Sequence, residues 1–244
     1  MSLQATFAVA ERVLLQLRRD PRTLALVVGV PCLLETLLKE LFEAQPRLFQ
    51  HVGAPLLGLF PFVTMFLVTS ITMLRERVSG TLERLMTLPL GKLDLLAGYG
   101  IAFAVLAAVQ AAAVSALAFG ALGLDTAGPR WVVGALAVGN AVLGSALGLF
   151  FSAFARTEFQ AVQFMPAVVF PQILLCGLFV ARGAMATWLR WLSDALPLTY
   201  AYDALAHTAA GTLDARFAAD VGVVGGAAIL ALALGAATLR RRTA

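Results

Sequence analysis

Residues 75–89 read RERVSGTLERLMTLP, a charged stretch between two long apolar runs. Residues 52–74 before it and residues 95–124 after it contain no Asp, Glu, Lys or Arg. About 20 apolar residues in a helix cross the hydrocarbon core of a bilayer. Each flanking run is therefore long enough to span a membrane. We expect the charged stretch to lie at a membrane face between two spanning helices, where a membrane protein would meet a soluble partner.

The composition extends this interpretation to the whole chain. Of the 244 residues 60% are hydrophobic and only 13% are charged, whereas a soluble domain carries roughly 25% charged residues. The apolar runs lack the alternation of barrel strands, so they are predicted to be helices. We therefore expect an all-α integral membrane protein, with residues 1–244 as one domain. The predicted transmembrane helices cover residues 23–41, 52–74, 95–121, 131–155, 159–181 and 221–240.

The distribution of Lys and Arg predicts the orientation of these six spans, because cytoplasmic loops carry the excess of positive charge. Twelve of the 18 Lys and Arg residues fall on the side that holds the N-terminal segment, residues 75–92, Arg156 and residues 240–242. The other six fall on the opposite side. Both termini and the charged stretch are thus predicted to be cytoplasmic, in a bacterial-type cytoplasmic membrane. The net charge of +4 follows from this flanking and does not indicate a nucleic-acid partner.

The first 22 residues do not read as a cleaved signal, because Glu11 and Asp20 lie among the arginines and no small-residue cleavage site follows the apolar stretch. Apolar residues recur instead at helical spacing. These residues are Leu3, Phe7, Ala10, Leu14 and Leu17. We expect residues 1–22 to form an amphipathic helix in the cytoplasmic interface.

The long connection of residues 182–220 is predicted to contain two short helices on the outer side. Trp188, Leu189, Trp191 and Leu192 gather aromatic and apolar mass at helical spacing, and Trp favours the membrane interface. The sequence leaves open whether these helices are re-entrant or lie on the surface.

Two Gly-xxx-Gly spacings predict close helix contacts, since glycine lets helix backbones approach each other. Gly144 and Gly148 form one, and Gly222 and Gly226 form the other. Packing within the chain is the first interpretation of both, and a subunit interface is the second.

No motif of enzyme chemistry is present in the sequence. It contains no H-E-x-x-H metal motif, no G-x-S-x-G nucleophile motif and no phosphate-binding loop around Lys92. The chain is therefore not expected to be an enzyme, to hold a metal or to bind a cofactor of its own.

The charged stretch has two interpretations. One is a solvated connection between spans. The other is a short amphipathic helix that docks in a partner's groove, with Val78, Leu82, Leu85 and Met86 on one face and Pro89 ending the helix. The apolar face favours the second.

Glu35 is an acidic residue inside a predicted span. A charge at bilayer depth is costly, so such residues usually face a bundle interior or a cavity. Glu35 could serve substrate passage or gating. Alternatively it lies near the outer end of the span and pairs with Lys39 four residues later.

Three segments together resemble ABC type-2 exporter permeases, with the drug-resistance and nodulation-exporter branches closest. Residues 75–89, followed by GKLDLLAGY at 91–99 and by Gln110, resemble the family's E-x-x-x-G-T-L-E-x-L…P segment. LLCGLFV at 174–180 is similar to its L-x-G-L-F stretch, and PLTYAYDAL at 197–205 is similar to its P-L-T-Y segment. The sequence departs from the family pattern in the outer region. There Ala181 replaces a common Pro, Leu196 a common Asn and Ala206 a common Arg.

The resemblance implies a permease that moves a hydrophobic or amphipathic drug or lipid out of the cytoplasm. It implies a coupling helix after the second span, seated in a separate ATP-binding subunit that holds ATP and Mg. Two such subunits would work with two permeases. One permease would be this chain, and the other would be a second copy of it or a paralogue. Export of polysaccharides or lipid-linked glycans is the alternative, followed by an ATP-independent secondary transporter.

Two groups of site residues follow from the resemblance. The coupling contacts are expected at Glu76, Arg77, Gly80, Thr81, Glu83 and Arg84. The candidate substrate path or gate comprises Glu35, Phe60, Phe170 and Phe179.

Overall fold

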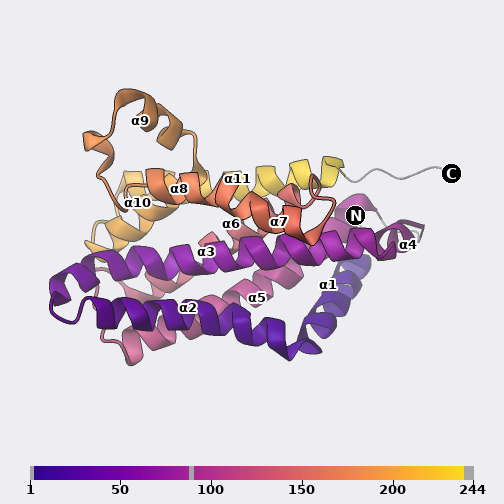
Figure 1. Cartoon of the computed structure of the whole chain (residues 1–244), viewed down its shortest axis with the longest axis horizontal. Coiled ribbons are helices and arrows are strands. Elements are labelled where there is room, and N and C mark those ends of the chain that lie inside the picture. The colour runs from indigo at the N-terminus through magenta and orange to yellow at the C-terminus, as the bar shows by residue number, and fades with distance from the viewer. Residues whose placement is uncertain (1–2, 88–90, 239–244) are drawn as a thin grey trace.

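The structure, a computed structural model, describes residues 3–87 and 91–238, without the side chains of residues 82, 83, 86, 92 and 93. Every regular element within these ranges is helical (Figure 1). The first five are α1 (Leu3–Arg18), α2 (Pro21–Leu41), α3 (Pro46–Val78), α4 (Thr81–Thr87) and α5 (Lys92–Gly120). They are followed by α6 (Arg130–Phe151), α7 (Glu158–Phe164), the π-helical turn η1 (Met165–Val169) and α8 (Phe170–Leu175). The last four are the 3-10 turn η2 (Arg182–Ala184), α9 (Thr187–Asp194), α10 (Pro197–Ala209) and α11 (Ala215–Thr238).

Within the described ranges, four helices are long and apolar enough to cross a membrane: α3, α5, α6 and α11. Helix α2 has 21 residues, but four of them are charged. The predicted span of residues 159–181 is helical up to Leu175, with a π-helical turn inside it, and residues 176–181 are not helical. It divides into α7, η1 and α8, because Pro166 and Pro171 each lack the N–H that continues an α-helical ladder.

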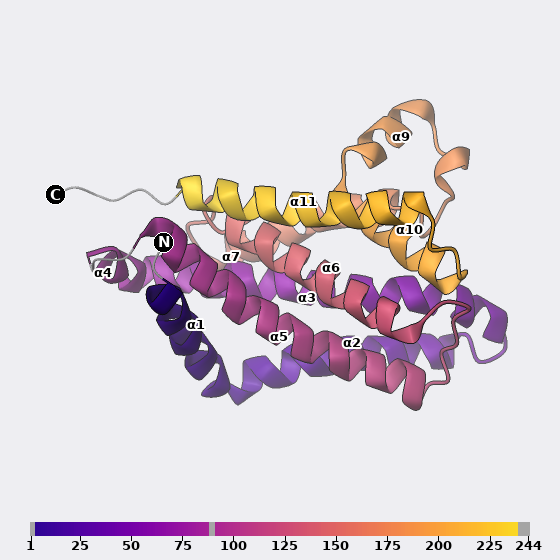
Figure 2. The same ribbon diagram turned by 180° about the vertical axis from the view of Figure 1, so that it is seen from behind.

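The two ends of the bundle differ. One end gathers α1, α4 and the start of α7, as the two opposite views show (Figures 1 and 2). The other end carries α9 and α10, the two short helices predicted in the long connection. Helix α10 packs into the bundle through the buried Leu198 and Leu205, whereas α9 projects from it with Trp188 and Trp191 exposed.

Helix α3 is the central element, and its contact with α6 depends on two glycines. A Cβ atom on Gly144 would overlap the carbonyl oxygen of Phe62, and one on Gly148 would overlap that of Phe66. Only glycine therefore permits this approach of the two backbones. The predicted packing of this pair is confirmed. The same prediction for Gly222 and Gly226 is wrong, because a Cβ on either would have no neighbour within 4 Å on the open face of α11.

A hydrogen bond from α5 satisfies a break in the α2 ladder. Pro31 lies inside α2 and has no N–H to donate to the carbonyl of Val27, four residues earlier. The buried Gln110 side chain supplies the donor, with its Nε2 2.7 Å from the Val27 oxygen. The same Nε2 also donates to the hydroxyl of Thr64 on α3. One side chain therefore joins three helices at the proline.

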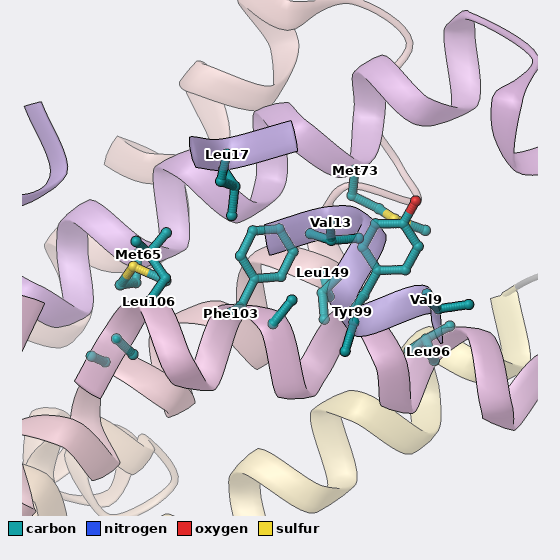
Figure 3. Packing of buried hydrophobic residues seen from close by; sticks show 14 of the residues in the cluster. Val9, Val13, Leu17, Met65, Met73, Leu96, Tyr99, Phe103, Leu106 and Leu149 are labelled. Atoms are coloured by element: carbon teal, nitrogen blue, oxygen red, sulfur yellow. The ribbon is translucent and has the colours of Figure 1, made fainter. Parts of the chain in front are cut away.

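Helix α1 packs against the core with a face that includes three of the five predicted apolar positions, the buried Ala10 and Leu17 and the half-buried Leu14. Val9 and Val13 are buried, and Figure 3 shows Val13 between the rings of Tyr99 and Phe103. Phe7, assigned to the apolar face, is instead 60% exposed. Periodicity identifies apolar positions on a helix. It does not distinguish positions that contact protein from those left for lipid.

Candidate functional site

The predicted coupling segment begins with a sharp break between α3 and α4. Helix α3 ends at Val78, and Gly80 follows with φ +70, a left-handed conformation that glycine adopts without strain. The hydroxyls of Ser79 and Thr81 lie 2.9 Å apart across this break. The prediction that Val78, Leu82, Leu85 and Met86 share one helical face is therefore wrong, because Val78 belongs to α3 and the others to α4.

Glu76, one turn before the break, is directed into the protein. It is 8% exposed, and its two carboxylate oxygens accept hydrogen bonds from Nη2 of Arg12 at 3.1 and 3.2 Å. Nη1 of Arg12 donates to the Tyr99 hydroxyl at 3.4 Å. Burial lowers the pKa of Arg12, but Tyr99 and Glu76 outweigh this effect and the net pKa shift is upward. This cluster joins α1, α3 and α5 beside the junction of α3 and α4.

A second ion pair joins the end of α3 to the start of α7. Arg75 Nε lies 2.7 Å from Glu158 Oε1, and its Nη2 lies 3.2 Å from Oε2. The hydrogen bond from Arg75 lowers the pKa of Glu158. Both side chains are more than half exposed, so this pair contributes below about 1 kcal/mol. The buried Leu74 and Ala161, which belong to one apolar cluster, join α3 and α7 beside this pair.

A hollow of about 300 Å³ lies between α1, the start of α2 and the α3–α4 junction. Asp20 stands at its α2 side as the helix cap, accepting hydrogen bonds from the backbone N and hydroxyl of Thr23 at 3.1 and 2.6 Å. These bonds lower the pKa of Asp20. The hollow is lined by Val13, Gln16, Leu17, Asp20, Thr23, Thr72, Arg75, Glu76, Ser79 and Thr81.

The other predicted coupling residues gather around the same junction. Arg77 is half-buried, and its Nε has no hydrogen-bond partner among the described residues. Gly80 and Thr81 lie at the break, where Thr81 is half-buried, while Arg84 is exposed on α4. The side chain of Glu83 lies outside the described part of the structure. Of the set, Glu76 is committed to an internal contact and Arg84 is available at the surface.

The predicted substrate-path residues are placed unevenly. Glu35 is fully buried in α2, and neither carboxylate oxygen has a partner among the described residues. Its predicted pairing with Lys39 is wrong, because the Lys39 ammonium lies over the ring of Phe49, 5.1 Å from the centroid. Phe60 is half-buried. Phe170 and Phe179, near α8, are 48% and 66% exposed.

Arg12, Tyr99 and Glu158 were not predicted from the sequence. Each acts through a residue at least 64 positions away in the chain. A single sequence contains no signal for such a pairing, whereas a helical repeat or a motif is local. Correlated substitutions in a set of related sequences could have indicated them.

The site shows no arrangement for metal chemistry. No group of three His, Cys, Asp or Glu side chains that could hold a metal ion occurs within residues 3–87 and 91–238. This end of the bundle presents charged and polar groups, Arg84 and the rim of the hollow, to which a partner protein could dock.

Comparison with known proteins gives two similarities. The family model described as "ABC-2 type transporter" matches residues 4–209. The chain is also similar to the "ABC transporter G family member 20" of Dictyostelium discoideum, at 27% identity over 147 residues. That match covers 60% of this chain and 20% of the relative, so the chain corresponds to about a fifth of that protein.

Proposed function

Because the chain belongs to the ABC-2 type transporter family, we propose that it is the membrane subunit of an ATP-driven exporter. In this proposal ATP and Mg are bound by a separate ABC ATPase subunit, and this chain does no ATP chemistry. The observation that carries the proposal is the short helix α4, set off by Gly80 at the end of the longest helix of the bundle.

The connections of α3 to other helices support α4 as a coupling element, because α4 follows directly after α3. Helix α3 has 33 residues and at 1.5 Å per residue is about 50 Å long, enough to connect the α4 end with the α9 end. Arg12 attaches α1 to α3, and Leu74 of α3 and Ala161 of α7 belong to one buried apolar cluster. A displacement of α4 by a docked ATPase would therefore move α1, α3 and α7 together.

The proposed topology has six membrane crossings. To the four long apolar helices it adds α2 and the helical residues 159–175, which belong to α7, η1 and α8. The excess of Lys and Arg at the α4 end supports a cytoplasmic location for that end. Both termini are then cytoplasmic, and the membrane is of the bacterial cytoplasmic type.

The proposed assembly contains two permeases and two ATPases. The second permease is another copy of this chain or a paralogue. ATP binding would bring the ATPases together and shift the population between inward-open and outward-facing arrangements. The exposed Phe170, Leu174 and Phe179 form an apolar surface on the α8 side that suits a hydrophobic or amphipathic cargo, such as a drug or lipid, at the seam between permeases.

Affinity purification of the tagged chain from its host membrane tests the partner. We expect an ABC ATPase, identified by mass spectrometry, to copurify in a one-to-one ratio. The double variant Glu83→Lys, Arg84→Glu should lose the ATPase at least tenfold while retaining the helix content of the wild type.

Arg190→Glu is the matched control, because Arg190 is also exposed but lies on α9 at the opposite end of the bundle. It should copurify the ATPase as the wild type does. Purified chain that pumps cargo uphill in vesicles without an ATPase would refute the proposal.

A further inference from the structure

A second hollow, of about 460 Å³, lies where α6 ends and α7 begins. One part of its lining is polar and basic, and the rest is apolar. The lining residues are Phe154, Arg156, Gln160, Gln163, Phe164 and Ala167. We propose that this hollow binds the phosphodiester headgroup of an acidic phospholipid, such as phosphatidylglycerol, with Arg156 as the residue that contacts the phosphate.

Arg156 has a free guanidinium. The acidic residue nearest to it in sequence is Glu158, and both carboxylate oxygens of Glu158 are occupied by Arg75. Arg156 itself is exposed and makes no ion pair among the described residues. A planar guanidinium binds phosphate through two parallel hydrogen bonds. The site therefore presents an uncompensated charge suited to a phosphate.

The glutamines supply further donors to a phosphate. The Oε1 atom of Gln160 accepts a hydrogen bond from the backbone N of Arg156 at 2.8 Å, and this bond holds the side chain at the rim of the hollow. Its amide nitrogen then remains as a donor. Gln163 is exposed one turn further along α7. Amide N–H groups at this position would bind the phosphate oxygens that Arg156 leaves unpaired.

The apolar part of the lining distinguishes a lipid from a soluble anion. Phe154 is 56% exposed, and Phe164 and Ala167 complete the wall. Phe159, beside the hollow in sequence, is 71% exposed. Phe154 lies three residues past the end of α6, a helix apolar enough to span, so the hollow lies at the level where headgroups meet acyl chains. Glycerol and the first methylenes of a lipid would cover these aromatic surfaces.

The position also matches the charge pattern of the molecule. Basic pockets between helices on the cytoplasmic side bind acidic headgroups, and each Lys or Arg near an acidic surface contributes about a fivefold preference. The lipid contact requires only that α6 cross the membrane. Its assignment to the cytoplasmic leaflet rests on the proposed topology.

The test uses the purified full chain in nanodiscs of equal parts phosphatidylglycerol and phosphatidylcholine, with retained lipids counted by native mass spectrometry. We expect about a fivefold enrichment of phosphatidylglycerol in the wild type. Arg156→Gln and Gln163→Glu should each reduce the ratio to near one, and Arg156→Lys, which keeps the charge but not the two parallel hydrogen bonds, should give an intermediate ratio. Arg190→Gln is the control, since Arg190 is exposed at the opposite end, and should match the wild type.

Three outcomes overturn the inference. The first is a wild type without enrichment. The second is unchanged enrichment in Arg156→Gln, or in Gln163→Glu if Arg156→Gln does not fold. The third is loss of enrichment on adding millimolar inorganic phosphate, which would indicate a soluble anion. No ATPase takes part in this measurement, so its failure and the failure of the proposed function are separable. Gln163 is exposed, so the variant at that position answers the question even if Arg156→Gln fails to fold.

Discussion

Replacing Gln110 with Leu should destabilise the chain more when Pro31 is present than when it is absent, because Pro31 leaves the Val27 carbonyl without a backbone donor. Leu is close to Gln in volume but donates no hydrogen bond. In the wild-type chain the substitution removes the 2.7 Å bond to Val27 and the bond to Thr64. In a Pro31→Ala background, the backbone N–H restored at position 31 donates to Val27 by the ordinary helical pattern.

The magnitude follows from the burial of these groups. Gln110 is fully buried, and a buried acceptor left without a donor costs about 1–3 kcal/mol. Gln110→Leu should therefore cost about 2 kcal/mol when Pro31 is present. In the Pro31→Ala background only the bond to Thr64 is lost, and interhelical hydrogen bonds in membranes average about 0.6 kcal/mol. The coupling free energy between positions 31 and 110 should be about 1–1.5 kcal/mol.

A double-mutant cycle measures this coupling, with the free energy of unfolding obtained by SDS titration in mixed micelles for the wild type, both single variants and the double variant. Val109→Leu is the control, because Val109 is exposed on the same helix, and its effect should be the same with and without Pro31→Ala. Equal costs of Gln110→Leu in the two backgrounds would refute the reasoning, since the Val27 carbonyl would then not be what Gln110 satisfies.

Gly144→Ala should lower the free energy of unfolding by about 1–3 kcal/mol, because its Cβ would meet the Phe62 carbonyl oxygen, whereas Gly222→Ala should be neutral or stabilising because no atom lies within 4 Å. The same SDS titration compares them, and equal effects would contradict the packing argument. The Arg75–Glu158 pair should give an acid-dependent contribution: the folded pKa of Glu158 is lowered, so its stabilisation is present above the unfolded pKa near 4.5 and is lost as the pH falls through the folded value. Glu158→Gln should lower the free energy of unfolding by less than about 1 kcal/mol at pH 7 and by little at pH 3. An equal loss at both pH values would exclude the ion pair as its cause.

The sequence indicates the helical class and much of the helix layout because these depend on local composition. The uncharged runs around residues 52–74 and 95–124 correspond to α3 and α5. The segment at 75–89 indicated the family, to which the chain belongs. Within this segment the left-handed Gly80 separates α4 from α3. Helical periodicity alone did not predict this break.

The tertiary structure decides which polar groups are free and which are engaged. Sequence assigned Glu76 to a partner surface, but Arg12 holds it inside the protein. The sequence left two interpretations of Glu35 open, a position in the bundle interior and a pair with Lys39. The fold buries the carboxylate and turns the Lys39 ammonium onto Phe49. Hydropathy and spacing determine that a chain forms membrane-length helices, since each residue contributes to them independently. The neighbour that each side chain meets depends on how helices far apart in the chain pack, and the structure supplies that information.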